Sequence, residues 1–131
     1  MLKARDIMTT DLLTIQPECS IREAIELLLD RHISGLPVVD HAGRLVGILT
    51  EFALLAVAYD SHVKEETVAS HMTTSVLTIE ADAPIREAAD LCLVHRVRRV
   101  PVMEEGRLVG LISRRDVLRA VHEGSRTAAA S

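Results

Sequence analysis

MTTDLLTI at residues 8–15 returns almost unchanged as MTTSVLTI at residues 72–79, and this repetition decides the fold. The correspondence continues along the chain in the same order: IREA at 21–24 and 85–88, PV at 37–38 and 101–102, and, after a one-residue deletion, GRLVG at 43–47 and 106–110. Matches in one order and at one spacing indicate an internal duplication, so one structural unit is written twice.

Each copy predicts the element order strand, helix, strand, strand, helix. The helix starts are marked by a capping box, SIRE at 20–23, in the first copy and by Asp82 and Pro84 in the second. The two strands that follow each helix are joined by a glycine-containing turn and predict a hairpin. The predicted strands are 12–15, 36–39 and 45–49 in the first copy and 76–79, 100–103 and 108–112 in the second, and the last helices are about 51–59 and 114–122.

A single copy of this size buries too little of its surface to be stable alone, whereas two copies can cover each other's sheets. The predicted fold class is therefore α/β (α+β), with two βαββα repeats packed by pseudo-two-fold symmetry through their sheets. We expect the first repeat at residues 1–62 and the second at 63–123. Residues 124–131 are small and polar and predict a disordered tail.

Composition excludes several classes of function. The 131 residues include one Tyr, one Phe and no Trp, which argues against stacking on single-stranded nucleic acid, and the net charge of −4 makes nucleic acid an unlikely partner. No apolar run approaches the roughly 18 residues of a membrane span, and the first residues lack a signal-peptide pattern, so a cytoplasmic protein is expected by default. Cys19 and Cys92 lie in or beside apolar helical patterns and are interpreted as free thiols.

Catalytic and metal sites are not predicted. The sequence holds no Ser/His/Asp grouping, no nucleophilic Cys with a base and no Walker loop, so we expect that the protein is not an enzyme and needs no cofactor. The six histidines do not follow the spacing of metal ligands, which argues against a zinc site.

Three motifs carry a resemblance to a known family: DIMT at 6–9, GLPVVD at 35–40 and GRLVGILT at 43–50, each with a counterpart in the second copy. In this order, and twice, they resemble a tandem pair of CBS domains (a Bateman module) over roughly residues 3–122. The resemblance implies a small stand-alone regulatory module that binds an adenosine-containing ligand, namely AMP, ADP, ATP or S-adenosylmethionine, in clefts between the paired sheets. It also implies a homodimer.

The family's ligand motif, Gly-x-x-Ser/Thr-x-x-Asp, is complete in GLISRRD at 110–116. The carboxylate of Asp116 can accept hydrogen bonds from both vicinal hydroxyls of a ribose, and the helix start beside it offers free amides to phosphate. Ser113 and Asp116 also form a helix-capping pattern, which would serve stability alone. The duplicated context favours the ribose site. The first copy has Ala53 where the carboxylate belongs, so we expect one good site per chain and one cleft that is degraded or differently selective.

The resemblance carries further positions into the same site. Opposite Asp116 and Ser113 it implies six residues of the first copy's motifs: Met8, Leu13, Ile33, Ser34, Gly35 and Pro37. The first three would form apolar walls around adenine, and backbone groups near Ser34 and Gly35 would read its edge. Taken without the family, the apolar members are ordinary core residues.

Arg98 and Arg99 match positions that resemble phosphate-contacting pairs in the γ subunit of AMP-activated protein kinase. Their guanidinium groups suit phosphate oxygens, and the alternative is solvated arginines or a salt bridge to Glu104 or Glu105.

Two functions follow. The first is a sensor of an adenosine-containing ligand that signals through a dimer or through the surface read by an unidentified protein partner. The alternative is a ligand-free structural or protein-interaction module, for which Ala53 is the best support.

Overall fold

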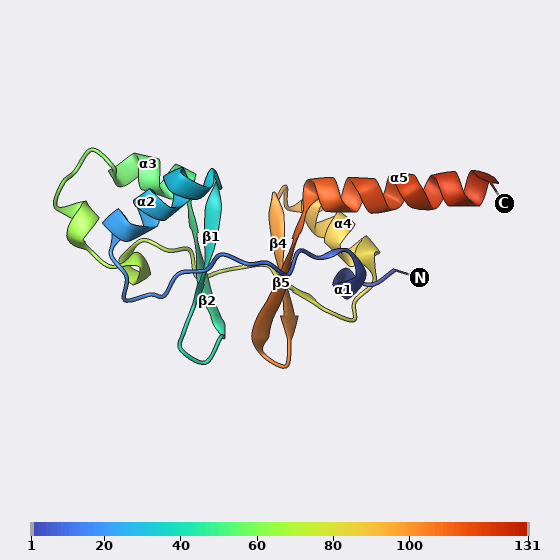
Figure 1. The fold of residues 1–131 in the computed structure, drawn as a ribbon, viewed down its shortest axis with the longest axis horizontal. Helices are drawn as coiled ribbons and strands as arrows, with labels where there is room; N and C mark the ends of the chain where they lie inside the picture. Colours follow the sequence, from blue (N-terminus) through green and yellow to red (C-terminus); the bar gives the residue numbers. More distant parts are fainter. Residues whose placement is uncertain (1, 131) are drawn as a thin grey trace. The chain divides into compact units, whose positions relative to one another are not determined.

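The structure is a computed structural model, which describes the backbone of residues 2–130 and the side chains of residues 2–124. By its contacts the chain divides into two units: unit 1 holds Met1–Leu12 with Leu77–Ser131, and unit 2 holds Leu13–Val76. The beginning of the chain therefore packs with the second repeat of the sequence. Both units contain helices and strands in the repeated order, which confirms the mixed α/β class (Figure 1).

Unit 2 is built around one hairpin and two helices. Its elements are α2 (Ile21–Arg31), β1 (Gly35–Val39), β2 (Leu45–Thr50), α3 (Glu51–Val57) and two 3₁₀ turns, η1 (Val63–Glu65) and η2 (Val68–Ser70). β1 and β2 are antiparallel. The Ser20 side chain caps α2 by accepting a hydrogen bond from the Glu23 amide at 3.1 Å, as the capping pattern predicts.

The strand expected at 12–15 is reduced to a single bridge between Ile15 and Val38. The Ile15 amide donates to the Pro37 carbonyl at 3.1 Å, and the Val39 amide donates to the Ile15 carbonyl at 2.9 Å. The next bond of a parallel ladder needs an amide two residues after Ile15. Pro17 occupies that place and has no N–H, so the pairing stops there.

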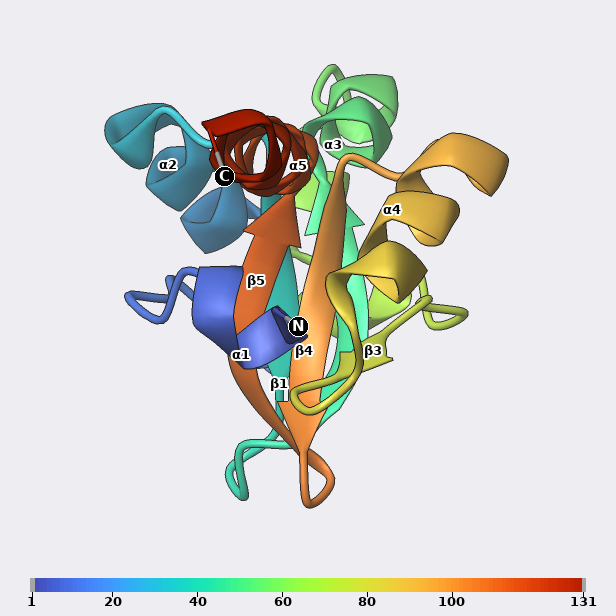
Figure 2. The same cartoon turned by 90° about the vertical axis from the view of Figure 1, so that its right-hand side faces the viewer.

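Unit 1 has a three-stranded sheet. Its elements are α1 (Ala4–Ile7), β3 (Ile79–Glu80), α4 (Ile85–Val94), β4 (Arg99–Glu104), β5 (Arg107–Ser113) and α5 (Arg114–Ala130). The strand order is β3-β4-β5, with β3 parallel and β5 antiparallel to β4 (Figure 2). Ala81, at the position that corresponds to Pro17, donates to the Met103 carbonyl at 2.9 Å and extends the parallel pairing.

Each unit has its own apolar core. The core of unit 2 consists of Ile15, Ile21, Ala24, Leu28, Leu36, Val38, Leu49, Leu54 and Val68. The core of unit 1 consists of Ala4, Ile79, Ala81, Ala88, Val100, Val102, Ile112 and Val117. These side chains come from the inner faces of the hairpins and from the periodic apolar positions of the helices, as expected for amphipathic elements.

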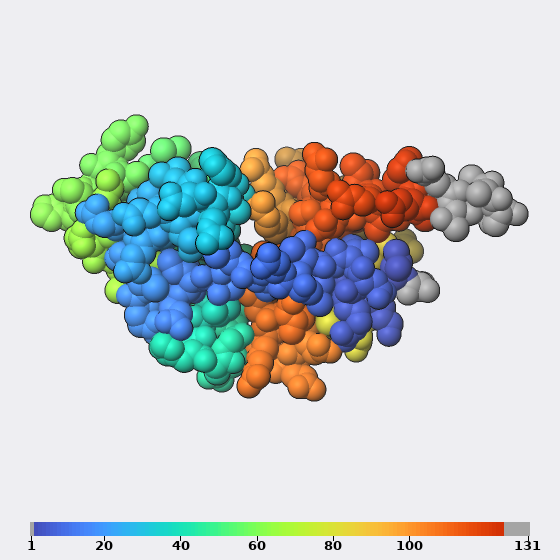
Figure 3. Space-filling model, in the orientation of Figure 1, coloured from blue at the N-terminus to red at the C-terminus, as the bar shows by residue number. Residues whose placement is uncertain are grey.

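The N-terminal segment is joined to unit 1 by backbone hydrogen bonds. The Ala4 amide donates to the Ala83 carbonyl at 2.8 Å, and Thr9 and Leu111 exchange two bonds of 2.8 and 3.0 Å. In Figure 3 the dark-blue atoms of this segment lie against the orange and red atoms of β5 and α5. α1 and its flanks therefore supply the edge that β5 would otherwise expose.

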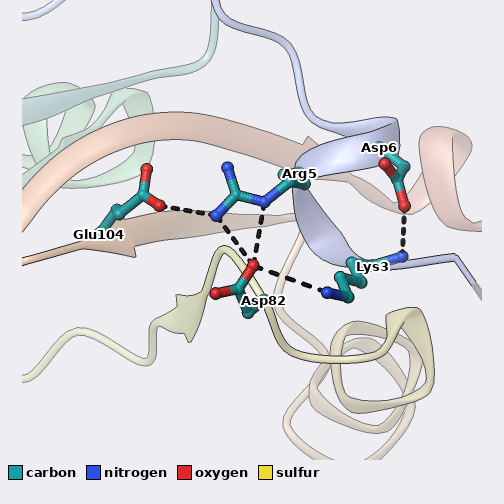
Figure 4. A network of polar contacts seen from close by, with 5 residues as sticks. All are labelled: Lys3, Arg5, Asp6, Asp82 and Glu104. Atoms are coloured by element: carbon teal, nitrogen blue, oxygen red, sulfur yellow. Dashed lines mark hydrogen bonds and ion pairs between the residues drawn. The ribbon is translucent and has the colours of Figure 1, made fainter.

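A cluster of ion pairs fixes α1 in the same unit (Figure 4). Arg5 donates from Nη2 to Asp82 at 2.9 Å and to Glu104 at 2.6 Å, and Lys3 lies 3.9 Å from Asp82. The hydrogen bonds from Arg5 lower the pKa of Asp82 below its usual range, and the two carboxylates raise the pKa of Arg5.

The last helix of each repeat ends at a different residue from the one that the sequence predicts. α3 ends at Val57, earlier than expected, whereas the backbone of α5 continues to Ala130. The predicted disordered tail, 124–131, lies almost entirely outside the residues whose side chains are described. Among the helices that the structure describes, none is long and apolar enough to cross a membrane.

Candidate functional site

The junction of β5 and α5 holds the two residues that the ligand motif singles out. The Ser113 amide donates to Oδ2 of Asp116 at 2.9 Å, and the Asp116 amide donates to Oγ of Ser113 at 3.1 Å. This reciprocal pair is the capping box that the sequence allowed as an alternative. It satisfies amides at the helix start and also fixes the orientation of the carboxylate.

The remaining oxygen of Asp116 faces Arg119. Oδ1 lies 3.9 Å from Nη1 of Arg119, and the Asp116 side chain is 19% exposed. At 3.9 Å this is a loose ion pair rather than a hydrogen bond, so Oδ1 keeps acceptor capacity. The carboxylate is thus held by one oxygen and available through the other.

Arg98 and Arg99 are backbone neighbours of the β5–α5 junction. Arg99 is the first residue of β4 and stands opposite Ser113 in the antiparallel register. The Arg98 carbonyl accepts a hydrogen bond from the Arg114 amide at 3.1 Å. Glu104, one of the two alternative partners for these arginines, is paired with Arg5 instead. The backbones of both arginines therefore lie beside the start of α5, next to the residues that orient the carboxylate.

Met8 also belongs to unit 1. Its side chain packs directly on Gly110, the first residue of the motif, where a Cβ would overlap the Met8 sulfur and leave no room for a side chain. Met8 is half-buried and contacts the unit 1 core. It performs the packing role that the sequence analysis kept as its alternative, at the same strand that carries the motif.

The other candidate residues lie in unit 2. Pro37 is buried, and Leu13 and Ile33 are half-buried against the unit 2 core. The Ser34 carbonyl accepts from the Glu51 amide at 2.9 Å, and Gly35 stands opposite Thr50 in the register. The sequence candidates thus form two groups, one at the β5–α5 junction and one at the β2–α3 junction.

The β2–α3 junction keeps only half of the capping box. Thr50 Oγ1 accepts from the Ala53 amide at 3.2 Å, but Ala53 offers no carboxylate in return. Ser34 and Gly35 stand where unit 1 has Arg98 and Arg99. Of the two junctions, only the one in unit 1 therefore has a carboxylate for a ribose and a pair of arginines for a phosphate at these positions.

Two features of this site were missed by the sequence analysis. The first is the close packing of Met8 on Gly110, two residues far apart in sequence. The sequence did contain a signal for it, because both copies of the repeat keep the Met and the Gly (Met8 and Gly110, Met72 and Gly47). The second is the ion pair between Glu104 and Arg5, which forms because the N-terminal segment packs in unit 1. Among the described side chains, no group of His, Cys, Asp or Glu has the arrangement of a metal site.

Comparisons with known proteins agree on one family. The model of the CBS domain matches residues 4–60 and 66–123. The A-adding tRNA nucleotidyltransferase of Aquifex aeolicus is 34% identical over 122 residues, which are 93% of this chain and 15% of that protein. The chain spans only 15 to 41% of the length of the first three curated relatives.

Solved structures extend the likeness to nearly whole chains. CBSX2 from Arabidopsis thaliana, in complex with AMP, superposes with a TM-score of 0.86 at 31% identity, covering 95% of this chain and 99% of that one. The CBS domain pair of protein MJ0100, in complex with 5′-methylthioadenosine and S-adenosyl-L-methionine, gives 0.80 at 28% identity, covering 95% and 98%.

Proposed function

Because this chain belongs to the CBS domain family, we propose that it is a regulatory module which binds an adenosine-containing ligand: AMP, ADP, ATP or S-adenosylmethionine. Two proteins of the same fold are described in complex with AMP and with S-adenosyl-L-methionine and 5′-methylthioadenosine. The observation that carries the proposal is the Asp116 carboxylate, oriented by Ser113 and accompanied by Arg98 and Arg99.

Asp116 has the chemistry of a ribose acceptor. Its Oδ2 is engaged by the Ser113 amide, so rotation of the carboxylate is restricted, and Oδ1 keeps acceptor capacity for a hydroxyl. A charge-assisted hydrogen bond of this kind is stronger than a neutral one. Arg98 and Arg99 are exposed, and we propose that they neutralise the phosphate of a nucleotide.

The adenine-binding role of the other residues stays a prediction. Met8, Leu13 and Ile33 remain the proposed apolar walls, and Ser34, Gly35 and Pro37 the proposed backbone contacts. In favour of this role, none of the three apolar side chains is fully buried, so each keeps surface for a ligand. We propose one good site per chain, since Ala53 replaces the second carboxylate.

We propose that binding acts through a dimer or a partner surface, in the cytoplasm, without a required cofactor and without catalysis. Exposed apolar side chains on α3, α4 and α5 support a protein contact, among them Phe52, Leu93 and Leu118. Cys19 and Cys92 are free thiols, as in proteins of reducing compartments.

A ligand-free interaction module is the second candidate. The capping box favours it, because the bonds between Ser113 and Asp116 account for both residues by helix stability alone. The incomplete junction at Ala53 is consistent with the same reading.

Thermal melts with and without millimolar AMP, ADP, ATP, S-adenosylmethionine, 5′-methylthioadenosine and GTP separate the two. A ligand at about 100 times its dissociation constant stabilises the fold by roughly 2.7 kcal/mol, which raises the midpoint by several degrees. We expect this of an adenine ligand and not of GTP. If no adenine ligand raises the midpoint, the sensor proposal is wrong and the interaction module stands.

Asp116→Ala locates the site. By titration calorimetry we expect Asp116→Ala to raise the dissociation constant of the adenine ligand about 10- to 100-fold, since hydrogen bonds to a charged group contribute about 1.5–3 kcal/mol. Ser20→Ala is the matched control, because it removes the cap of α2, a helix that carries none of the proposed ligand contacts. It should lower the melting temperature and leave the affinity unchanged. Equal affinity of Asp116→Ala and the wild type would assign Asp116 to capping only.

A further inference from the structure

Arg99 and Ser113 form the last pair of the β4–β5 ladder, at the junction that holds Asp116. The Arg114 amide donates to the Arg98 carbonyl at 3.1 Å, and this bond flanks the pair, so Arg99 and Ser113 are a non-hydrogen-bonded pair. The side chains of such a pair share one face of the sheet and lie closer together than those of a hydrogen-bonded pair. The Ser113 amide points away from β4 and donates to Asp116 instead. Arg99 therefore starts beside the residue that orients the carboxylate.

Arg98 and Arg99 are not equivalent at this place. Successive residues of a strand point to opposite faces, and Val100, which follows Arg99, is fully buried in the core of unit 1. The Arg99 side chain therefore leaves the strand on the face away from that core, which is the face it shares with Ser113. Arg98 precedes the strand and lies outside the register. Of the two arginines, it is Arg99 that the sheet places beside Ser113.

The sequence around this pair is strongly cationic. Residues 96–99 and 113–116 carry five arginines and one acidic residue, a net charge of +4. Arg98, Arg114 and Arg115 are exposed, and none of the three makes an ion pair with any residue whose side chain is described. A site with this excess of positive charge attracts a phosphate group and repels a cationic group.

The matching pair of unit 2, Gly35 and Thr50, has the same backbone geometry without the charge. The hydrogen bond that flanks it, donated by the Glu51 amide at 2.9 Å, occupies the same place in the ladder. Residues 32–35 and 50–53 carry one acidic residue and, with His neutral, a net charge of −1. A Cβ at Gly35 would meet a backbone oxygen at 3.5 Å, which is an ordinary contact. The backbone thus has room for a side chain at this position in both units, and unit 1 has an arginine there.

We propose that Arg99 selects the charge of the ligand at the β5–α5 junction, so that this site takes a 5′-phosphorylated adenosine (AMP, ADP or ATP) in preference to S-adenosylmethionine. The inference rests on the proposed function and adds the class of ligand and the residue that sets it. The three nucleotides carry an anionic phosphate on the 5′ carbon, where S-adenosylmethionine carries a sulfonium cation. A guanidinium binds phosphate oxygens through two parallel hydrogen bonds and repels the sulfonium.

Titration calorimetry with matched ligands tests the role of Arg99. AMP and 5′-methylthioadenosine differ at the 5′ carbon, where the group is anionic in AMP and neutral in 5′-methylthioadenosine. We expect Arg99→Gln to raise the dissociation constant of AMP about tenfold or more and that of 5′-methylthioadenosine less than about twofold, since only AMP loses a bond between charged groups. S-adenosylmethionine should bind this variant at least as tightly as it binds the wild type.

Three further variants sharpen the assignment. Arg99→Lys keeps the charge and should keep most of the difference in affinity between AMP and 5′-methylthioadenosine. Arg107→Gln is the matched control, because it removes the same charge from the exposed start of β5, and it should change none of the affinities. Arg98→Gln should weaken AMP less than Arg99→Gln does. Equal effects of these two variants would overturn the choice of Arg99 over Arg98.

The remaining outcomes separate the inference from the function on which it rests. If Arg99→Gln weakens AMP and 5′-methylthioadenosine equally, or weakens neither, charge selection by Arg99 is wrong and the adenosine site stands. Tighter binding of S-adenosylmethionine than of AMP by the wild type has the same meaning. A wild type that binds none of these ligands overturns both.

Salt dependence gives an independent measurement that needs no variant. Raising NaCl from about 50 to about 500 mM should weaken AMP and leave 5′-methylthioadenosine nearly unchanged, because salt screens the attraction between exposed charges. Equal responses of the two ligands to salt would contradict a cationic site for the 5′ group.

Discussion

The β5–α5 junction of unit 1 and the β2–α3 junction of unit 2 share one sequence pattern and differ in their polar groups. In unit 1 Ser113 and Asp116 cap each other, and Arg98 and Arg99 lie next to them. In unit 2 the cap is one-sided because Ala53 replaces the carboxylate. Both units have the same backbone arrangement, a strand followed directly by a helix, but only unit 1 has the carboxylate and the two arginines. The contrast shows that the strand–helix junction forms without the carboxylate, so the fold of unit 2 does not depend on it.

The close approach of strand and methionine is common to both units, and its removal gives the largest expected effect. A Cβ on Gly47 would lie 2.7 Å from Met72 Sδ and 2.9 Å from the Thr73 carbonyl oxygen. Because a backbone atom is among these neighbours, Gly47→Ala should destabilise the fold by about 1–3 kcal/mol in urea unfolding.

Gly110→Ala is the comparison. The three nearest neighbours of its new Cβ are the Sδ, Cγ and Cβ atoms of Met8, and the outer atoms of this side chain are flexible. We expect a smaller loss of stability than for Gly47→Ala, and partial recovery with Met8→Ala. If the Gly47→Ala variant has the same midpoint of urea unfolding as the wild type, the strand moves to accept the Cβ without loss of stability.

The degraded junction can be completed by one substitution. Ala53→Asp places a carboxylate where Asp116 stands in unit 1, so that it can accept from the Thr50 amide as Asp116 accepts from Ser113. We expect a gain of about 0.5–1 kcal/mol, as for other cap bonds and acidic groups in a first turn. Ala53→Asn, which keeps an acceptor without the charge, is the matched control.

Calorimetry with the same variant sharpens the comparison of the two junctions. If Ala53 alone degrades the second site, Ala53→Asp raises the number of adenine ligands bound per chain from one toward two. An unchanged stoichiometry would show that the carboxylate missing at Ala53 is not the only reason for the loss of the second site.

Much of this molecule was predictable, because the duplication repeats its signals. The hairpins, the capped helix after Ser20 and the motif at 110–116 follow from local pattern and agree with the structure. The strands expected at 12–15 and 76–79 were wrong in extent, because pairing begins only at Ile15 and Ile79. After Ile15 the pairing stops at Pro17, which has no amide to continue the ladder. By contrast, the packing of residues 1–12 with unit 1 depends on long-range backbone bonds such as Ala4 to Ala83. A periodic pattern carries no information about those partners.

The smallest expected effect concerns one carboxylate in each unit, Asp82 in unit 1 and Asp40 in unit 2, which are held in different ways. In unit 1 the hydrogen bonds from the Arg5 side chain lower the pKa of Asp82. In unit 2 the backbone amide of Arg44 is the main reason that the pKa of Asp40 is lowered. A side chain can be removed by substitution while a backbone amide stays. Arg5→Gln should therefore raise the pKa of Asp82 toward about 3.9, whereas Arg44→Gln should leave the pKa of Asp40 low.

The sign of the pH dependence follows from the lowered pKa of Asp82. A carboxylate whose pKa is lower in the folded state stabilises the fold above its unfolded pKa of about 3.9, and this contribution is lost as the pH falls through the folded pKa. Wild type and Arg5→Gln should thus differ slightly in melting temperature at pH 7 and converge as the pH falls below the folded pKa of Asp82. Titration of the carboxyl carbons by NMR measures both pKa values directly. If Asp82 titrates at the same pH with and without Arg5, the ion pairs of α1 contribute nothing in solution, as is common for exposed pairs. The backbone hydrogen bonds, such as the one from Ala4 to Ala83, would then be sufficient to hold the N-terminal segment in unit 1.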